Sequence, residues 1–291
     1  MEEKKELRKV LQVRKLGSVI AIFLGLIGMQ MAAYILYVLG VFLRSFWKQG
    51  DFVAALDTIA RSGDDGLGNI NIWLSVISAC LCLVWCGALY RRSFWRQKPF
   101  SYRKAFGGKR IPGIVSVAFG SCVLLTLLVS VLASLIPSAF TGYNQVMDQL
   151  DYRSSTITSV YVLLIGPVSE EIIFRGAMMD RLKLAFPFWT ANIIQAAFFG
   201  LYHMNFIQGV YAFCLGIILG LILEVTGTIL GNIAAHVIFN GTSMLLGLFS
   251  GGDGILGVLQ WIFLMVTGIT ALVWGISYFL RGCSFCTGNS Q

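Results

Sequence analysis

The chain has 291 residues, of which 57% are hydrophobic and only 12% are charged, and its mean hydropathy is +0.77. Soluble domains carry about 25% charged residues, so this composition excludes an ordinary soluble globular protein and indicates an integral membrane protein. The formal net charge is +8, but the basic residues lie between apolar stretches, which argues for membrane orientation and against nucleic-acid binding.

Long apolar stretches predict about eight transmembrane helices, because about 20 apolar residues are needed to cross the hydrocarbon layer. The stretches do not alternate in polarity as barrel strands do, so we expect an all-α polytopic membrane protein. The predicted spans, in chain order, are residues 16–43, 70–90, 112–136, 157–175, 187–205, 209–224, 228–249 and 255–280.

The chain divides into four segments. Residues 1–15 are predicted to form a short basic amphipathic helix on the inner membrane surface, and residues 16–156 hold the first three spans with their loops. Residues 157–280 form a transmembrane core that holds the polar residues discussed below, and residues 281–291 are a C-terminal tail. Cys283 and Cys286 form a C-x-x-C in this tail, but a single pair lacks the second half of a zinc site.

The basic residues predict the orientation of the chain. Residues 1–15 contain six Lys or Arg, and residues 91–110 contain eight with no acidic residue. Together with Arg175, Arg181, Lys183 and Arg281, 18 of the 22 basic residues fall on one side of the membrane. The positive-inside rule then places both termini in the cytoplasm, and residues 44–69 form an outer loop with Gly and Asp turn signals.

Glu170, Glu171, His203 and His236 lie inside stretches apolar enough to cross a membrane. The two histidines are the only ones in the chain. Ionisable groups inside a membrane are costly and usually line a site or a pathway. Glutamate and histidine are also the residue types that general acid–base hydrolysis requires.

Helix spacing separates the two glutamates. Glu171 lies four residues before Arg175, so the two side chains share a helix face and are predicted to form an ion pair. Glu170 points about 100° away and has Phe174 four positions on, which leaves it as the free carboxylate.

The neighbouring spans place other polar groups near Glu170. The fourth and fifth spans form a hairpin around Phe186 and Pro187, so Glu170 and His203 lie at similar depth and can hold one water between them. His203 shares a helix face with Phe199. His236 and Asn240 are also four residues apart, and two donors aimed at one point suit an oxyanion or a substrate carbonyl.

Each feature also has a structural interpretation. A glutamate beside an arginine is often an interfacial ion pair, a membrane histidine often makes one interhelical hydrogen bond, and Asn240 alone is typical of helix–helix contacts. Glu224 is interpreted as an interfacial residue, with a ligand in the same cavity as the alternative. The coincidence of acid–base groups on three consecutive segments favours a site.

The motifs E-E-x-x-x-R, F-x-x-x-H and H-x-x-x-N begin here at Glu170, Phe199 and His236. In this order on successive membrane helices they resemble the CPBP family, the CAAX-protease and bacteriocin-processing intramembrane peptidases, also called the Abi family. The resemblance covers roughly residues 157–245. It implies an eight-helix fold with a cavity open to the cytoplasm and hydrolysis of a peptide bond.

In that family, the residues matching Glu170 and His203 would activate water, and those matching His236 and Asn240 would stabilise the oxyanion. Glu171, Arg175 and Phe199 would be supporting residues. The family has also been described as metalloprotease, which makes Glu170, His203 and His236 alternative zinc ligands. A metal-free glutamate mechanism is favoured, because H-E-x-x-H is absent and no second-shell acid accompanies the histidines in the sequence.

We therefore predict an intramembrane endopeptidase in a multi-pass, bacterial-type plasma membrane, acting on a membrane-associated peptide or protein. The alternative is a catalytically silent regulator or immunity protein of the same fold that binds a membrane partner such as a sensor kinase. A transporter with a proton-relay Glu/His pair is a third hypothesis. The resemblance does not specify prenylated substrates.

Overall fold

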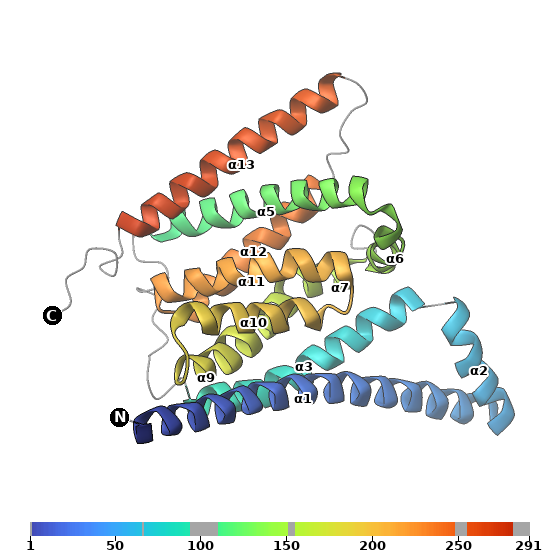
Figure 1. Ribbon diagram of the computed structural model, residues 1–291. Helices are drawn as coiled ribbons and strands as arrows, with labels where there is room; N and C mark the ends of the chain where they lie inside the picture. The colour runs from blue at the N-terminus through green and yellow to red at the C-terminus, as the bar shows by residue number, and fades with distance from the viewer. Residues whose placement is uncertain (1, 66, 94–109, 151–154, 248–254, 282–291) are drawn as a thin grey trace.

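The computed structural model describes residues 2–65, 67–93, 110–150, 155–247 and 255–281, and every regular element in these ranges is helical (Figure 1). This confirms the predicted all-α polytopic fold. The helices outside the fourth predicted span are α1 (Glu2–Gln49), α2 (Phe52–Asp65), α3 (Leu67–Ser93), α5 (Arg110–Leu135), η1 (Pro137–Ala139), α6 (Phe140–Leu150), α10 (Phe188–Tyr202), α11 (Phe206–Thr226), α12 (Ile229–Leu246) and α13 (Ile255–Arg281).

The fourth predicted span, 157–175, lies in one helical rod, Thr156–Lys183, in which α-helical and π-helical turns alternate. Its parts are α7 (Thr156–Val160), η2 (Tyr161–Ile165), α8 (Gly166–Glu170), η3 (Glu171–Met179) and α9 (Asp180–Lys183). The elements η2 and η3 are π-helical, a form that is rare and often occurs at functional sites. The glutamate pair lies at the junction of α8 and η3.

Seven helices of the described residues are long and apolar enough to cross a membrane, and they correspond to seven of the eight predicted spans. The remaining span, 187–205, corresponds to α10, which has 15 residues. At the usual rise per residue this helix is about 22 Å long, less than the hydrocarbon thickness of about 30 Å.

Two predicted segments differ in the structure. Residues 2–15 continue into the first span without a break, so the basic segment is the first part of α1. The predicted outer loop contains α2, which starts because Asp51 Oδ1 accepts the Val53 N–H at 2.8 Å after Gly50 has ended α1 with φ 65°. The basic loop at 94–109 and the cysteine pair at 283 and 286 lie outside the described residues.

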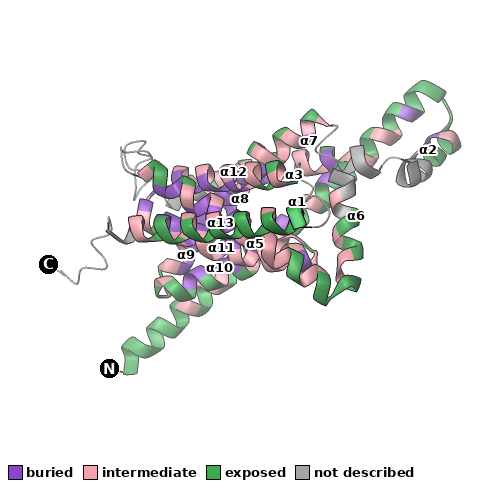
Figure 2. Cartoon of the chain, turned by 90° about the horizontal axis from the view of Figure 1, so that it is seen from above, coloured by how far each residue is buried: buried purple, intermediate pink, exposed green. Residues whose placement is uncertain are grey.

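The helices pack as a bundle with α1 and α3 on one side and α5 and α13 on the other (Figure 1). Buried positions gather on the central helices, and the first turns of α1 and much of α13 are exposed (Figure 2). Exposed leucine, isoleucine, valine and phenylalanine side chains cover these outer faces, as expected for helices that contact lipid.

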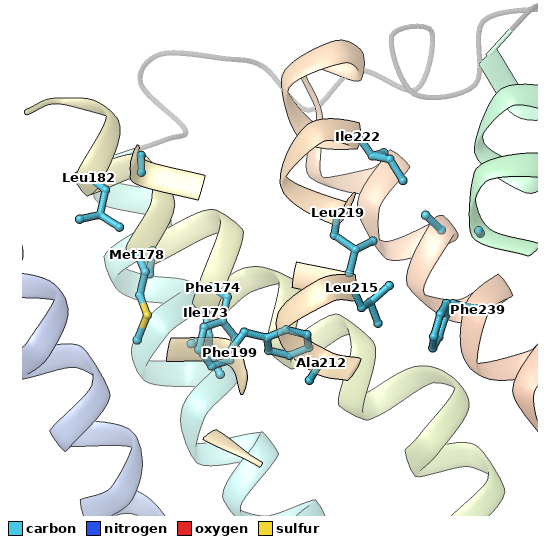
Figure 3. Close-up of a cluster of buried hydrophobic side chains, with 14 of the residues drawn as sticks. Ile173, Phe174, Met178, Leu182, Phe199, Ala212, Leu215, Leu219, Ile222 and Phe239 are labelled. Atoms are coloured by element: carbon cyan, nitrogen blue, oxygen red, sulfur yellow. The ribbon is translucent and has the colours of Figure 1, made fainter. Parts of the chain in front are cut away.

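The helices α10 and α11 form a tight hairpin at the centre. A Cβ atom on Gly200 would lie 2.7 Å from the carbonyl oxygen of Gly209, so only glycine permits this approach. The Asn205 side chain caps α11 by accepting the Gln208 N–H at 3.1 Å. Phe199 of α10 packs on Phe174 of η3, with ring centroids 5.0 Å apart (Figure 3). This contact joins the rod that holds both glutamates to the helix that His203 caps.

Candidate active site

Glu171 is fully buried and accepts hydrogen bonds from three side chains. Its Oε1 accepts from Arg175 Nη1 at 2.8 Å and from His236 Nδ1 at 2.9 Å, and its Oε2 accepts from Asn232 Nδ2 at 3.2 Å. The contact with Arg175 is the ion pair that helix spacing predicts. A buried carboxylate is tolerated when it is paired and hydrogen-bonded in this way.

Arg175 is also fully buried and links Glu171 to two further elements. Its Nη2 donates to the carbonyl oxygen of Gly216 on α11 at 3.3 Å, and its guanidinium lies 4.5 Å from the centroid of the Phe199 ring. The planar guanidinium is suited to this combination of ion pair, backbone contact and aromatic stacking.

His236 lies between the two glutamates. Its Nε2 is 3.6 Å from Glu170 Oε2, on the opposite side of the ring from the bond between Nδ1 and Glu171. Because an ionised carboxylate only accepts, the Nδ1 atom must hold the hydrogen. The side chain of Glu170 is partly exposed, whereas Glu171 is not, which agrees with Glu170 as the carboxylate open to a reactant.

His203 caps the C-terminus of α10, and its Nδ1 donates to the Phe199 carbonyl oxygen at 2.8 Å. Its ring packs edge-on against Phe199, with centroids 5.0 Å apart, and the centroid of His236 lies 6.0 Å from the same ring. Phe199 therefore contacts both histidines. His203 is within electrostatic range of Glu170, but within the described ranges no direct hydrogen bond joins the two side chains.

Asn240, on the same face of α12 as His236, donates from Nδ2 to the Val162 carbonyl oxygen at 2.8 Å. The amide nitrogen has a second hydrogen, which this bond does not use. The shared face of His236 and Asn240 agrees with the spacing, and their role as an oxyanion donor pair stays a prediction.

Three buried amides complete the polar network and were not predicted from the sequence. They are Asn192, Gln195 and Asn232, and all have fully buried side chains. Their side chains donate to the carbonyl oxygens of Ile217, Gly216 and Leu219 on α11, at 3.0, 2.9 and 2.7 Å. The available signal was an amide inside an apolar span, and Asn232 lies one helical turn before His236.

The histidines meet one requirement of a zinc site but the set as a whole does not fit. No acid lies beside the histidines in the sequence, but in the structure Glu171, 65 residues away, contacts His236 Nδ1 as an outer-shell carboxylate would. However, no three His, Cys, Asp or Glu side chains of the described residues are grouped so that they could hold a metal ion. Glu170, His203 and His236 thus do not form a three-ligand group in this arrangement.

Glu224, the remaining acidic residue near the core, pairs with Lys183. Both side chains are about one-third exposed, and Lys183 also lies 5.7 Å from the centroid of the Phe188 ring. These contacts agree with the interfacial interpretation of Glu224.

The comparison with protein families bears on this site. Residues 152–242 match the family model described as Type II CAAX prenyl endopeptidase Rce1-like. No curated protein and no solved structure matches the chain. The matched segment is less than half of the chain, yet it contains all seven site residues predicted from the three motifs. It confirms the resemblance to the CAAX-protease family and supports a protease at the family level.

Proposed function

We propose that the chain is an intramembrane endopeptidase that hydrolyses a peptide bond of a membrane-associated protein or peptide, with water activated by a glutamate. The observation that carries the proposal is the position of His236 between a fully buried, hydrogen-bonded Glu171 and a partly exposed Glu170. The buried pair of Glu171 and Arg175 holds the His236 imidazole in place, which leaves Glu170 and the Nε2 atom of His236 for chemistry.

Glu170, with His203, takes a proton from water while the water oxygen attacks the carbonyl carbon of the scissile bond. The carbonyl π electrons move onto oxygen, and His236 and Asn240 donate hydrogen bonds to that oxyanion. When the carbonyl re-forms, the C–N bond breaks and the leaving nitrogen receives the proton held by Glu170. The step consumes one water and needs no oxidant or reductant.

A donor role for His236 at the oxyanion requires a hydrogen on both ring nitrogens, which is the imidazolium form. Glu170 and Glu171 together contribute two negative charges when ionised, and Arg175 contributes one positive charge. With an imidazolium at His236, the formal charges of these four side chains sum to zero. The imidazolium also gives Nε2 the hydrogen that a donor requires, because Nδ1 already donates to Glu171.

A comparison of membrane peptides tests the proposal. Cells expressing the wild-type chain, Glu170→Gln or His203→Ala are compared by mass spectrometry of short membrane-associated peptides. We expect at least one peptide that requires the wild-type chain and is reduced by about 100-fold or more in both variants, since loss of a general base costs about 10²–10⁴-fold in rate. Reconstitution of the purified chain with that peptide's precursor then measures cleavage directly.

Glu224→Gln is the matched control, because it removes a carboxylate that pairs with Lys183 away from the site. It is expected to leave the peptide pattern unchanged. An unchanged pattern in Glu170→Gln and His203→Ala, with all proteins present at normal levels, would contradict the enzyme and favour a silent regulator. Flux of a small ion that depends on pH and on Glu170, with no cleavage, would favour the transporter hypothesis.

A further inference from the structure

The Val162 carbonyl is bonded by a side chain from another helix, although it lies inside a helical span. Asn240 Nδ2 of α12 donates to this oxygen at 2.8 Å. A carbonyl within a continuous helix normally accepts a backbone N–H from the following turn. The local chain around η2 explains why this carbonyl does not.

Two backbone donors would be available to Val162, and both are missing. The α-helical donor is the N–H of Gly166, four residues on, but this N–H bonds to the Tyr161 carbonyl, five residues back, in the π-helical turn. The π-helical donor would be residue 167, five residues on, but Pro167 has no N–H. The proline thus leaves an acceptor inside the membrane that must be satisfied from elsewhere.

The position of this acceptor ties two parts of the site together. Asn240 lies one helical turn after His236 on α12, and Pro167 lies three residues before Glu170 on the fourth span. The bond to Val162 therefore joins the helix that holds His236 to the rod that holds Glu170. It also fixes the amide plane of Asn240 and leaves one of its two hydrogens for a second acceptor.

We propose that Pro167 is a positioning residue for the site, because it creates the free Val162 carbonyl that holds the Asn240 amide in place. The effect on catalysis rests on the proposed peptidase function. The effect on stability does not, so the two can fail separately.

A double-mutant cycle between Pro167→Ala and Asn240→Leu tests the inference on the full chain purified in detergent. Leucine has the same branching of heavy atoms as asparagine and removes both donor and acceptor. We expect Asn240→Leu alone to lower Tm by about 2–8 °C, because it leaves the Val162 carbonyl without a partner inside a membrane span. In the Pro167→Ala background, the Tm loss caused by Asn240→Leu is expected to fall to half or less. The substituted alanine restores a backbone N–H that can bond to the Val162 carbonyl.

Asn192 provides the matched control, because its side chain also donates to a helix carbonyl, that of Ile217, at a place that Pro167 does not affect. The Tm losses of Asn192→Leu and Pro167→Ala should simply add. If Pro167→Ala does not accumulate, Pro167→Ser supplies the same N–H and replaces it in the cycle. The inference would be overturned if the Tm losses of Pro167→Ala and Asn240→Leu also add, as those of Pro167→Ala and the Asn192→Leu control do.

Cleavage kinetics separate a positioning role from a packing role. The substrate is the peptide that the mass-spectrometric comparison under Proposed function identifies. Pro167→Ala is expected to lower kcat by about 10-fold or more with little change in KM, because Asn240 keeps its hydrogens but loses the contact that orients them. An unchanged kcat despite coupled Tm values would limit the role of Pro167 to stability and overturn the positioning role. If Glu170→Gln also leaves cleavage unchanged, the proposed function is wrong. The coupling in Tm between Pro167 and Asn240 is still decided by the double-mutant cycle alone.

Discussion

At the scale of single residues, Arg175 combines three different kinds of partner. One guanidinium contacts a carboxylate, a backbone carbonyl and an aromatic ring, all buried. We expect Arg175→Met to destabilise the chain by about 3–5 kcal/mol, because the buried Glu171 loses its arginine counter-charge. Thermal or denaturant unfolding in detergent measures this loss.

The pair Glu171 and Arg175 also provides an internal control for that prediction. The double variant Glu171→Leu with Arg175→Met removes both charges and should lose less stability than the sum of the two single variants. If the stability loss of the double variant equals the sum of the losses of the two single variants, the two side chains contribute independently. Activity is expected to be lost in the double variant, because His236 loses the acceptor for its Nδ1.

Asn232 is a buried amide that contacts Glu171 directly. It donates to Glu171 and to the Leu219 carbonyl, so Asn232→Leu leaves two acceptors with one fewer donor. We expect a loss of about 1–3 kcal/mol in stability and a fall in kcat, because Glu171 then holds His236 less firmly. Asn144→Leu, at an exposed position of α6, is the control and should change neither quantity. Normal kcat in Asn232→Leu would show that Glu171 is positioned without it.

At the scale of helices, the contact between α10 and α11 depends on small residues. A Cβ atom on Gly220 would lie 1.8 Å from Asn192 Oδ1, and one on Gly216 would lie 2.9 Å from the Cβ of Ala196. The close approach allows Asn192 and Gln195 to reach the α11 carbonyls. The glycines on α11 therefore serve the hydrogen-bond network as well as the packing.

Gly220→Ala is accordingly expected to lower Tm and to reduce activity, because the Asn192 side chain must leave its position. Gly28→Ala is the matched control, since no atom lies within 4 Å of the Cβ that would be added on α1. That change should leave Tm unchanged or raise it slightly, as alanine favours helix more than glycine does. Equal behaviour of the two variants in a thermal scan would argue against a tight α10–α11 crossing.

Elements also differ in how far they could be predicted from the sequence. The pair Glu171 and Arg175 follows from spacing, because both residues belong to one helix and need no tertiary information. The contact between His236 and the glutamates depends on how α12 approaches the fourth span, which no local pattern encodes. For the same reason the spacing of Glu170 and His203 predicted equal depth but could not distinguish a direct contact from a separated pair.

The π-helical turns and α2 were missed for local reasons. A π-helical turn depends on competition between backbone donors, as at Gly166 and Pro167, and leaves no clear mark in hydrophobic periodicity. The segment of α2 contains glycine and aspartate residues that are typical of turns, yet Phe52, Val53 and Leu56 recur at helical spacing.

At the scale of the whole molecule, the orientation in the membrane stays a prediction from the basic residues. It places both termini and the segment 91–110 in the cytoplasm and the α1–α2 connection at Gly50 outside. Protease treatment of inside-out vesicles should cut epitope tags at both termini and spare a tag inserted after Gly50. Right-side-out vesicles should give the reverse result, and cleavage at only one terminus would contradict an even number of crossings.

The location of the Glu171–Arg175 pair within a single span affects how the protein is made. When the fourth span enters the bilayer, Glu171 and Arg175 can already neutralise each other, because they lie one turn apart on the same helix. Asn192 and Gln195 donate to carbonyls of α11, which emerges from the ribosome directly after α10. The order of the helices along the chain thus lets each of these polar groups find its partner soon after insertion, before the later spans arrive.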